Sequence, residues 1–126
     1  MHASDYAENK IADHLLSKTS WTMPSQVYVK LHTGDPGEAG TANAAGETTR
    51  QAANWYRSHP SASSGSASLS GTVSWTGVST GETYTHVSLW DASSGGNCLA
   101  SGAMGSSVAV SSGYNFNLTA MTVTVS

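Results

Sequence analysis

Charged residues are scarce in this 126-residue chain, and the basic ones all lie in its first half. Only 10% of the residues are Asp, Glu, Lys or Arg, and after Arg57 the only such residues are Glu82 and Asp91. With a net charge of −3, the chain lacks the basic surface that neutralises phosphates, so we expect no nucleic-acid partner. A neutral, hydroxyl-rich surface also repels its neighbours weakly, which favours an assembled state.

Cysteines and long apolar runs are also missing. The single cysteine, Cys98, excludes an internal disulfide framework and a zinc site made of several thiolates, and we expect it to be a small buried side chain. No apolar run approaches the roughly 20 residues of a membrane-spanning helix, and no basic-then-apolar leader opens the sequence. These absences predict a soluble protein, made in the cytoplasm, with no membrane partner.

Alternating apolar and polar residues predict that the chain is mainly β. The clearest alternation runs through residues 27–32, 67–75 and 84–90. A weaker strand is expected at 51–56, a returning hairpin strand at 98–104, and shorter strands from Val108 to the C-terminus. We expect the strand at 84–90 to be central. The charge-free segment 120–126 should be paired within the sheet or with a neighbouring subunit. Seven or eight short strands separated by turns predict a single antiparallel β-sandwich or jelly-roll-like domain over residues 1–126.

One short helix precedes the strands. Asp5 and Glu8 fit a capping box, and Ala7, Ile11 and Leu15 recur at the i+4 spacing of a helix face. The pattern predicts a helix over about residues 5–17. Because its apolar stripe is narrow, we expect it to lie on the side of a sheet or in a groove of a neighbour.

A compound turn follows the strand at 27–32. The sequence Thr-Gly-Asp-Pro-Gly over residues 33–37 removes a ladder donor at Pro36 and supplies two glycines, so the chain must leave the sheet there. The polar segment 34–49 has no regular period. Loops of this length are mobile or take part in interactions, and we interpret this one as a flexible interaction arm.

Groups able to do chemistry are present without the spacing that chemistry requires. Ser, His and Asp are all available for a catalytic triad, but the five histidines are widely separated. His32, Asp35 and Glu38 lie near one turn, yet they match no metal-binding pattern, and Asp35 is better explained as a residue that stabilises the turn. We predict no catalytic residue, no metal site and no cofactor.

Four tryptophans on a β scaffold suggest a sugar-binding platform as another possibility. Trp75 shares a strand face with Leu69 and Val73, which predicts a core position. Trp90 has the opposite parity from Val87 and Leu89, so it is the better candidate for an exposed contact, with a core or subunit-interface position as the leading interpretation of these tryptophans.

Three segments resemble a known family. They are DYAENKIADHLL (residues 5–16), VYVKLHTGDPGEAGTAN (residues 27–43) and THVSLWDASSGGNCLASG (residues 85–102). They are similar to small structural proteins of tailed bacteriophages, some labelled tail-fibre-like or minor virion proteins and some similar to capsid decoration, or cement, proteins. The resemblance implies binding and no catalytic residue.

From this resemblance we expect a non-enzymatic capsid decoration protein that binds and stabilises the assembled major capsid lattice. It should lie on the capsid exterior after assembly in the host cytoplasm, as a homo-oligomer with a trimer favoured. The alternatives are a minor tail or tail-fibre-attachment protein and, in another class, a carbohydrate-binding module. The residues expected to contact partners are Tyr6, Ile11, Leu15, His32, Asp35, Pro36, Glu38, Arg50 and Trp90.

Overall fold

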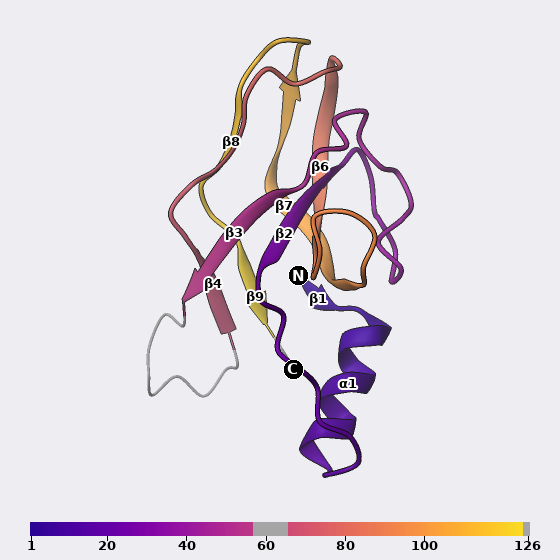
Figure 1. Ribbon diagram of the computed structural model, residues 1–126. Helices are drawn as coiled ribbons and strands as arrows, with labels where there is room; N and C mark the ends of the chain where they lie inside the picture. Colours follow the sequence, from indigo (N-terminus) through magenta and orange to yellow (C-terminus); the bar gives the residue numbers. More distant parts are fainter. Residues whose placement is uncertain (57–65, 125–126) are drawn as a thin grey trace.

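The computed structural model describes residues 1–56 and 66–124 and contains one helix and nine strands in these ranges (Figure 1). The helix α1 spans Asp5–Leu15. The strands are β1 (His2–Ala3), β2 (Val27–His32), β3 (Gln51–Tyr56), β4 (Ser66–Ser70), β5 (Val73–Trp75), β6 (Glu82–Trp90), β7 (Cys98–Val110), β8 (Phe116–Leu118) and β9 (Thr122–Thr124). The chain is mainly β with a single short N-terminal helix, as predicted.

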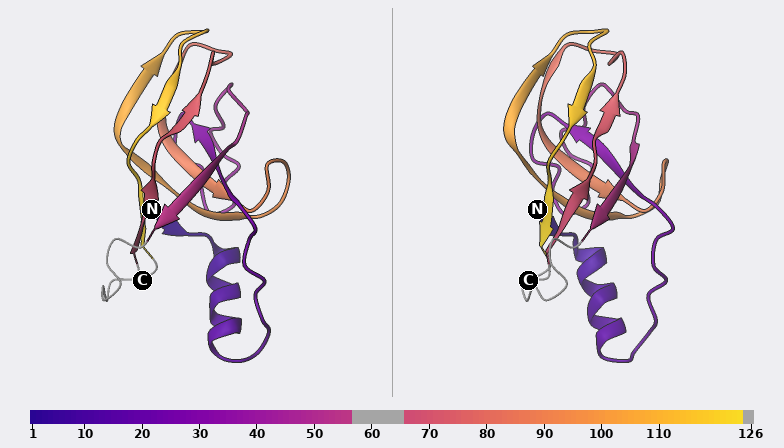
Figure 2. Two further views of the ribbon diagram at one scale, coloured as in Figure 1. Left: turned by 60° about the vertical axis from the view of Figure 1, so that its left-hand side comes forward. Right: turned by 90° about the vertical axis from the view of Figure 1, so that its left-hand side faces the viewer.

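All strand pairs are antiparallel. A seven-stranded sheet has the order β1-β7-β6-β2-β3-β4-β9, and β5 and β8 form a separate pair. The two edge strands of the large sheet, β1 and β9, also contact each other, so the sheet curls into a nearly closed, barrel-like sandwich (Figures 1 and 2). The predicted antiparallel β architecture is confirmed, and β6 is an interior strand of the sheet as expected.

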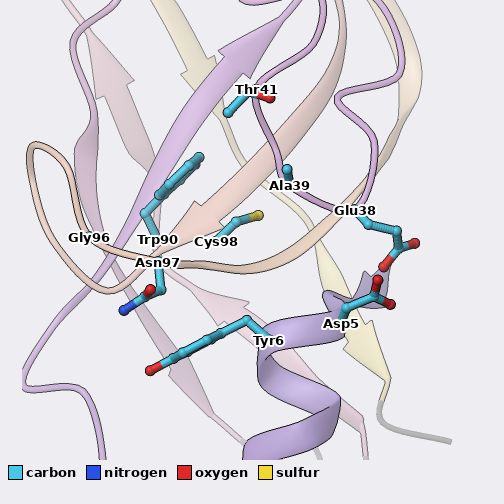
Figure 3. Close-up of a pocket in the computed structure, with 9 residues that line it drawn as sticks. All are labelled: Asp5, Tyr6, Glu38, Ala39, Thr41, Trp90, Gly96, Asn97 and Cys98. Carbon is cyan, nitrogen blue, oxygen red and sulfur yellow. The ribbon is translucent and has the colours of Figure 1, made fainter.

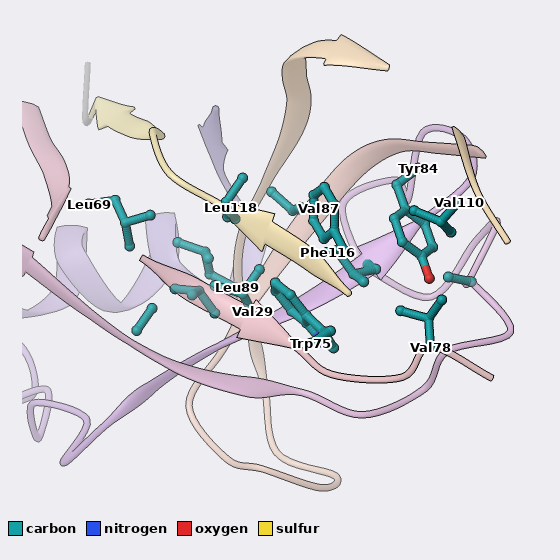
Figure 4. Packing of buried hydrophobic residues seen from close by; sticks show 14 of the residues in the cluster. Val29, Leu69, Trp75, Val78, Tyr84, Val87, Leu89, Val110, Phe116 and Leu118 are labelled. Carbon is teal, nitrogen blue, oxygen red and sulfur yellow. The ribbon is translucent and has the colours of Figure 1, made fainter. Parts of the chain in front are cut away.

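Large aromatic side chains fill the interior of this barrel (Figure 4). Phe116 contacts both Trp75 and Tyr84, with ring centroids 5.7 Å and 5.2 Å apart. The indole Nε1 of Trp75 donates to the Thr49 carbonyl at 2.8 Å, which satisfies the one polar atom of this buried ring. Burial raises the pKa of Tyr84 to about 12. The predicted core position of Trp75 is confirmed, and Cys98 is buried as expected.

The helix is two residues shorter than predicted, and its cap differs. Ser4, not Asp5, is the N-cap, because its hydroxyl oxygen accepts from the Ala7 N–H at 3.1 Å. The helix ends where Ser17 takes up a left-handed conformation with φ of 57°. Only Ala7 is buried, so α1 touches β1 and β7 near its start and extends away from the barrel (Figure 2).

The predicted strand over 67–75 is two strands. Gly71 has φ of 78°, a left-handed conformation that breaks the ladder and sends the chain from β4 in the large sheet to β5 in the small one. The side-chain parity survives this break, because Leu69, Val73 and Trp75 are all buried. The described part of the predicted strand 120–126 is β9, which pairs with β4. The sequence also predicts a turn-rich gap over residues 58–66, most of which lies outside the described residues.

The segment 34–49 is folded against the barrel, so its interpretation as a flexible arm is wrong. The amides of Thr33 and Ala45 form hydrogen bonds to Asn43 and Leu31, at 2.9 Å and 3.1 Å. Further along, the Glu82 carboxylate accepts from the amides of Gly46 and Glu47 at 3.0 Å and 3.2 Å. The loop has no helix or strand of its own, so these bonds give its backbone amides the partners that regular secondary structure would otherwise supply.

Candidate functional site

A groove forms where three separate segments of the chain meet (Figure 3). It has a volume of about 460 Å³ and lies between the start of α1, the loop 34–49, and the β6–β7 hairpin. Its lining residues are Asp5, Tyr6, Glu38, Ala39, Thr41, Trp90, Gly96, Asn97 and Cys98. The three segments on which the family resemblance rests are therefore brought together in space.

The start of α1 forms the first wall and is tied directly to β7. The Ser4 amide donates to the Leu99 carbonyl at 2.9 Å, and the Ser4 hydroxyl donates to the Cys98 carbonyl. Ser4 is 3% exposed, so these bonds are shielded from water. Because Ser4 also caps the helix, one residue fixes both the position and the direction of the turn that carries Asp5 and Tyr6.

The turn after β2 forms the second wall. The Asp35 carboxylate accepts from the Gly37 amide at 2.9 Å, and the Asn43 side-chain amide donates to the Asp35 carbonyl at 2.8 Å. Gly40 has φ of 70°, and a Cβ added there would lie 2.5 Å from the Cys98 sulfur. Only glycine therefore fits where the loop crosses the floor of the groove.

Trp90 forms the third wall and is buried, so the structure favours the core or interface interpretation of this tryptophan over an exposed contact. It is 6% exposed because the loop 34–49 covers the face of β6 that carries it. Its Nε1 donates to the Ser88 hydroxyl oxygen at 2.7 Å, and that hydroxyl lies 2.7 Å from His32 Nε2. The other ring nitrogen of His32 lies 2.9 Å from the Ala42 carbonyl, which can only accept. The proton is therefore on Nδ1, and Ser88 donates to Nε2.

This buried chain of hydrogen bonds has a consequence for protonation. His32 is fully buried, and desolvation lowers the pKa of its imidazole, although the hydrogen bond to Ala42 acts in the opposite direction. Protonation of Nε2 also removes the acceptor that Ser88 uses. His32 is thus held neutral and serves as a structural link between the loop and β6.

Arg50 clamps the outer face of the Trp90 ring. Its guanidinium carbon lies 4.0 Å from the ring centroid, and its Nη1 donates to the carbonyls of Ala92 and Gly95 at 2.9 Å and 2.7 Å. The clamp joins β3 to the β6–β7 hairpin. Lys30 lies 5.9 Å from the same ring, and burial, followed by the charge of Arg50, lowers the pKa of its ammonium group.

Two acidic residues line one edge of the groove. The carboxylates of Asp5 and Glu38 point toward one another there (Figure 3). Two like charges facing each other favour a cationic group between them. Burial raises the pKa of the Cys98 thiol to about 11, so this sulfur stays protonated at neutral pH and is a poor nucleophile. In the described ranges, no three His, Cys, Asp or Glu side chains are grouped so that they could hold a metal ion.

An expectation that no serine occupies a G-x-S-x-G sequence is wrong at the level of sequence, because Ser79 lies in one over residues 77–81. In esterases this pattern places a nucleophile on a turn from a strand to a helix. Here the segment joins β5 to β6, and the Ser79 hydroxyl donates to the Gly46 carbonyl at 3.3 Å. The structural context of a nucleophile is absent from this segment.

The structure divides the residues predicted to contact partners into three groups. Tyr6, Glu38 and Trp90 line the groove. His32, Asp35, Pro36 and Arg50 support its walls, and the burial of His32 and Pro36 corrects the expectation of direct contact, since neither reaches the surface. Ile11 and Leu15 lie elsewhere, on the projecting part of α1.

Asp5 and Thr41 lie in the helix and the loop from which contacts were expected but were not singled out, and sequence reasoning missed Asn97 and Cys98 as groove residues. These four residues lie on segments up to 93 positions apart (98 − 5), and no local period relates them. The available signal was the shared resemblance of the three segments that carry them. It indicated that the segments matter, without indicating that they converge.

Comparison with known proteins identifies the family. Residues 2–126 match the model of a family described as podophage GP4 fiber I protein gp80. The chain belongs to this family. No curated protein matches it.

As a member of the gp80 fiber family, the chain is a phage structural protein and a component of the virion, in agreement with the resemblance. A structural fiber family is also consistent with a non-enzymatic role. The description fits the predicted tail-fibre alternative better than the capsid decoration role. Among the described residues, no helix has the length and apolar character needed to span a membrane.

Proposed function

We propose that this chain is a non-enzymatic building block of a podophage tail fibre. The carrying observation is the family match, which extends over residues 2–126 and names a fiber protein. The fold supports this role, because a nearly closed antiparallel barrel leaves few open strand edges. Few open edges limit unspecific pairing between the many proteins packed in a virion. Capsid decoration, our first expectation, becomes the alternative that the experiment must exclude.

We further propose that the groove in Figure 3 is where the module attaches to a neighbouring virion protein. Its walls are fixed by buried hydrogen bonds of Ser4 and His32 and by the partly buried bond of Arg50 to Ala92, so it is formed before the partner arrives. The facing carboxylates of Asp5 and Glu38 suit a segment that presents a basic side chain. In a tail fibre this partner is another tail protein, and in a decoration protein it is the major capsid protein.

The location in the virion tests the proposal. Antibody-gold labelling should mark the tail of purified particles, and quantitative gel analysis should give the low copy number of a tail component. Labelling over the whole capsid at hundreds of copies per particle would establish decoration instead.

A charge reversal tests the groove. Glu38→Lys should abolish incorporation into particles when the variant is supplied to phage that lacks the gene, because a lysine there repels a basic partner segment. Asn117→Lys is the control, since it adds a lysine at an exposed position on β8, outside the groove. Equal incorporation of both variants would show that the groove is not the attachment site.

Carbohydrate binding has weaker support. Trp75 and Trp90 are buried, and Trp21 and Trp55 are only partly exposed, so the tryptophans form no open stacking platform. Titration of the tryptophan fluorescence with glycans tests this prediction.

A further inference from the structure

The projecting end of α1 carries a large exposed apolar surface. Leu15, Leu16 and Met23 are 75%, 67% and 83% exposed. We define the helix-tip surface as Ile11, Leu15, Leu16, Trp21, Met23 and Pro24, which lie on α1 and on the connector that leads to β2. Figure 2 shows this part of the chain standing clear of the strands, which leave it uncovered.

Two apolar grooves give this surface its shape, and both include Ile11 and Trp21. One, of about 330 Å³, lies between α1 and the connector. The other, of about 250 Å³, runs between α1 and the end of the barrel, where Trp55, Leu99 and other apolar residues line it. The Nε1 of Trp55 is buried there without a hydrogen-bond partner among the described residues. The helix-tip surface is therefore apolar and combines two grooves with two protruding leucines.

The size of the surface fits an interface between proteins. Leu15, Leu16 and Met23 alone present on the order of 400 Å², and exposed apolar patches of about 300–600 Å² on monomers are often functional. The two grooves add further apolar surface beside these side chains.

The charges along α1 match those of a second α1 that runs in the opposite direction, because acidic residues lie at its start and a lysine follows its end. Asp5 and Glu8 lie in the first turn, and Lys18 follows the last turn, with its amide bonded to the Asp13 carbonyl at 2.8 Å. If two helices run antiparallel about a point beside Asp13, Glu8 of each copy faces Lys18 of the other. The same centre sets Ile11 of each copy against Leu15 of the other. The opposed helix dipoles also attract.

We propose that a second copy of this chain covers the helix-tip surface, with the two α1 helices packed antiparallel about a two-fold axis. Such a contact uses the same patch on both subunits, so each leucine that protrudes from one copy meets an apolar groove of the other. This arrangement differs from the trimer expected from the resemblance. It concerns the chain alone and does not depend on its place in the virion.

Sedimentation velocity on the full purified chain tests the proposal. The mass should rise with concentration from 13.0 kDa to twice that value. Leu15→Glu should weaken the dimer by roughly tenfold or more, because it places a charge in an apolar contact. Asn9→Glu is the matched control, since it adds the same charge at an exposed helix position outside the helix-tip surface and should leave the dimer unchanged.

A charge exchange separates this arrangement from other modes of association. Glu8→Lys should weaken the dimer, because it places a lysine of one copy opposite Lys18 of the other. Adding Lys18→Glu should restore the dimer, because the facing charges are again opposite. Near-ultraviolet circular dichroism confirms that each variant is folded. A monomer at all concentrations, a trimer, a dimer insensitive to Leu15→Glu, or a double variant as weak as the single one would each overturn the proposal.

Discussion

Replacing Arg50 with alanine should destabilise the fold, although sequence reasoning placed this residue on a contact surface. The side chain lies over the Trp90 ring at 4.0 Å and forms two hydrogen bonds from Nη1 to the hairpin carbonyls of Ala92 and Gly95. Arg50→Ala removes all three interactions. It also uncovers one face of an indole that is now 6% exposed.

The size of the loss follows from these contacts. A cation over an indole is worth about 0.5–2 kcal/mol. A hydrogen bond from a charged donor is worth about 1.5–3 kcal/mol, and partial exposure of Arg50 places both of its bonds below that range. We expect Arg50→Ala to lower the free energy of unfolding by about 2–4 kcal/mol. Arg50→Lys, which keeps the charge and loses the planar fork, should cost about half as much.

Urea unfolding followed by tryptophan fluorescence measures this loss. Lys30→Ala is the control, because its ammonium group lies 5.9 Å from the same ring and should contribute less than about 1 kcal/mol. If Arg50→Ala costs no more than Lys30→Ala, Arg50 is not a clamp. A defect in virion incorporation without loss of stability would then support its predicted role as a contact residue.

Two further predictions concern the interior beneath the groove. Burial lowers the pKa of His32, so the unfolded chain binds its proton more readily, and this contribution to stability is lost as pH falls from about 6.5 through the lowered pKa. The urea midpoint should therefore differ less between pH 7.5 and pH 5 in His32→Gln than in the wild type. An equal change of the midpoint with pH in both proteins would contradict this. Gly40→Ala should cost about 3 kcal/mol from backbone strain and the clash with Cys98, against about 1 kcal/mol for Gly37→Ala, which has φ of 73° and open space. Thermal unfolding compares the two, and equal losses would show that the close approach is unimportant.

Local patterns predicted the elements whose environment repeats along the chain. Val27–His32 and the strand around Val87 were found because apolar and polar residues alternate along them, and the short helix because Ala7, Ile11 and Leu15 share one face. The break at Gly71 was missed since the alternation of buried residues continues through it. The two-residue alternation indicates which side chains are buried, but it does not indicate which strand pairs with the segment.

Trp90 shows the same limit for the site. Its parity correctly placed it on the opposite face from Leu89, but parity does not tell whether another segment covers that face. The cover comes from the loop 34–49, which is irregular in sequence and is held by hydrogen bonds that the amides of Thr33 and Ala45 donate and that the Glu82 carboxylate accepts. Such bonds depend on where the rest of the chain lies.

The sequence by itself therefore determined the fold class, the helix, most strands, the burial of Trp75 and Cys98, and the kinship with phage structural proteins. These properties are set by residue periods of 2.0 and 3.6 and by motifs that are contiguous in the chain. Only the tertiary structure decided that the helix start, the loop 34–49 and the β6–β7 hairpin meet in one groove, and that Leu15 and Leu16 remain uncovered. Both depend on the path of the chain between distant segments, which no local period encodes.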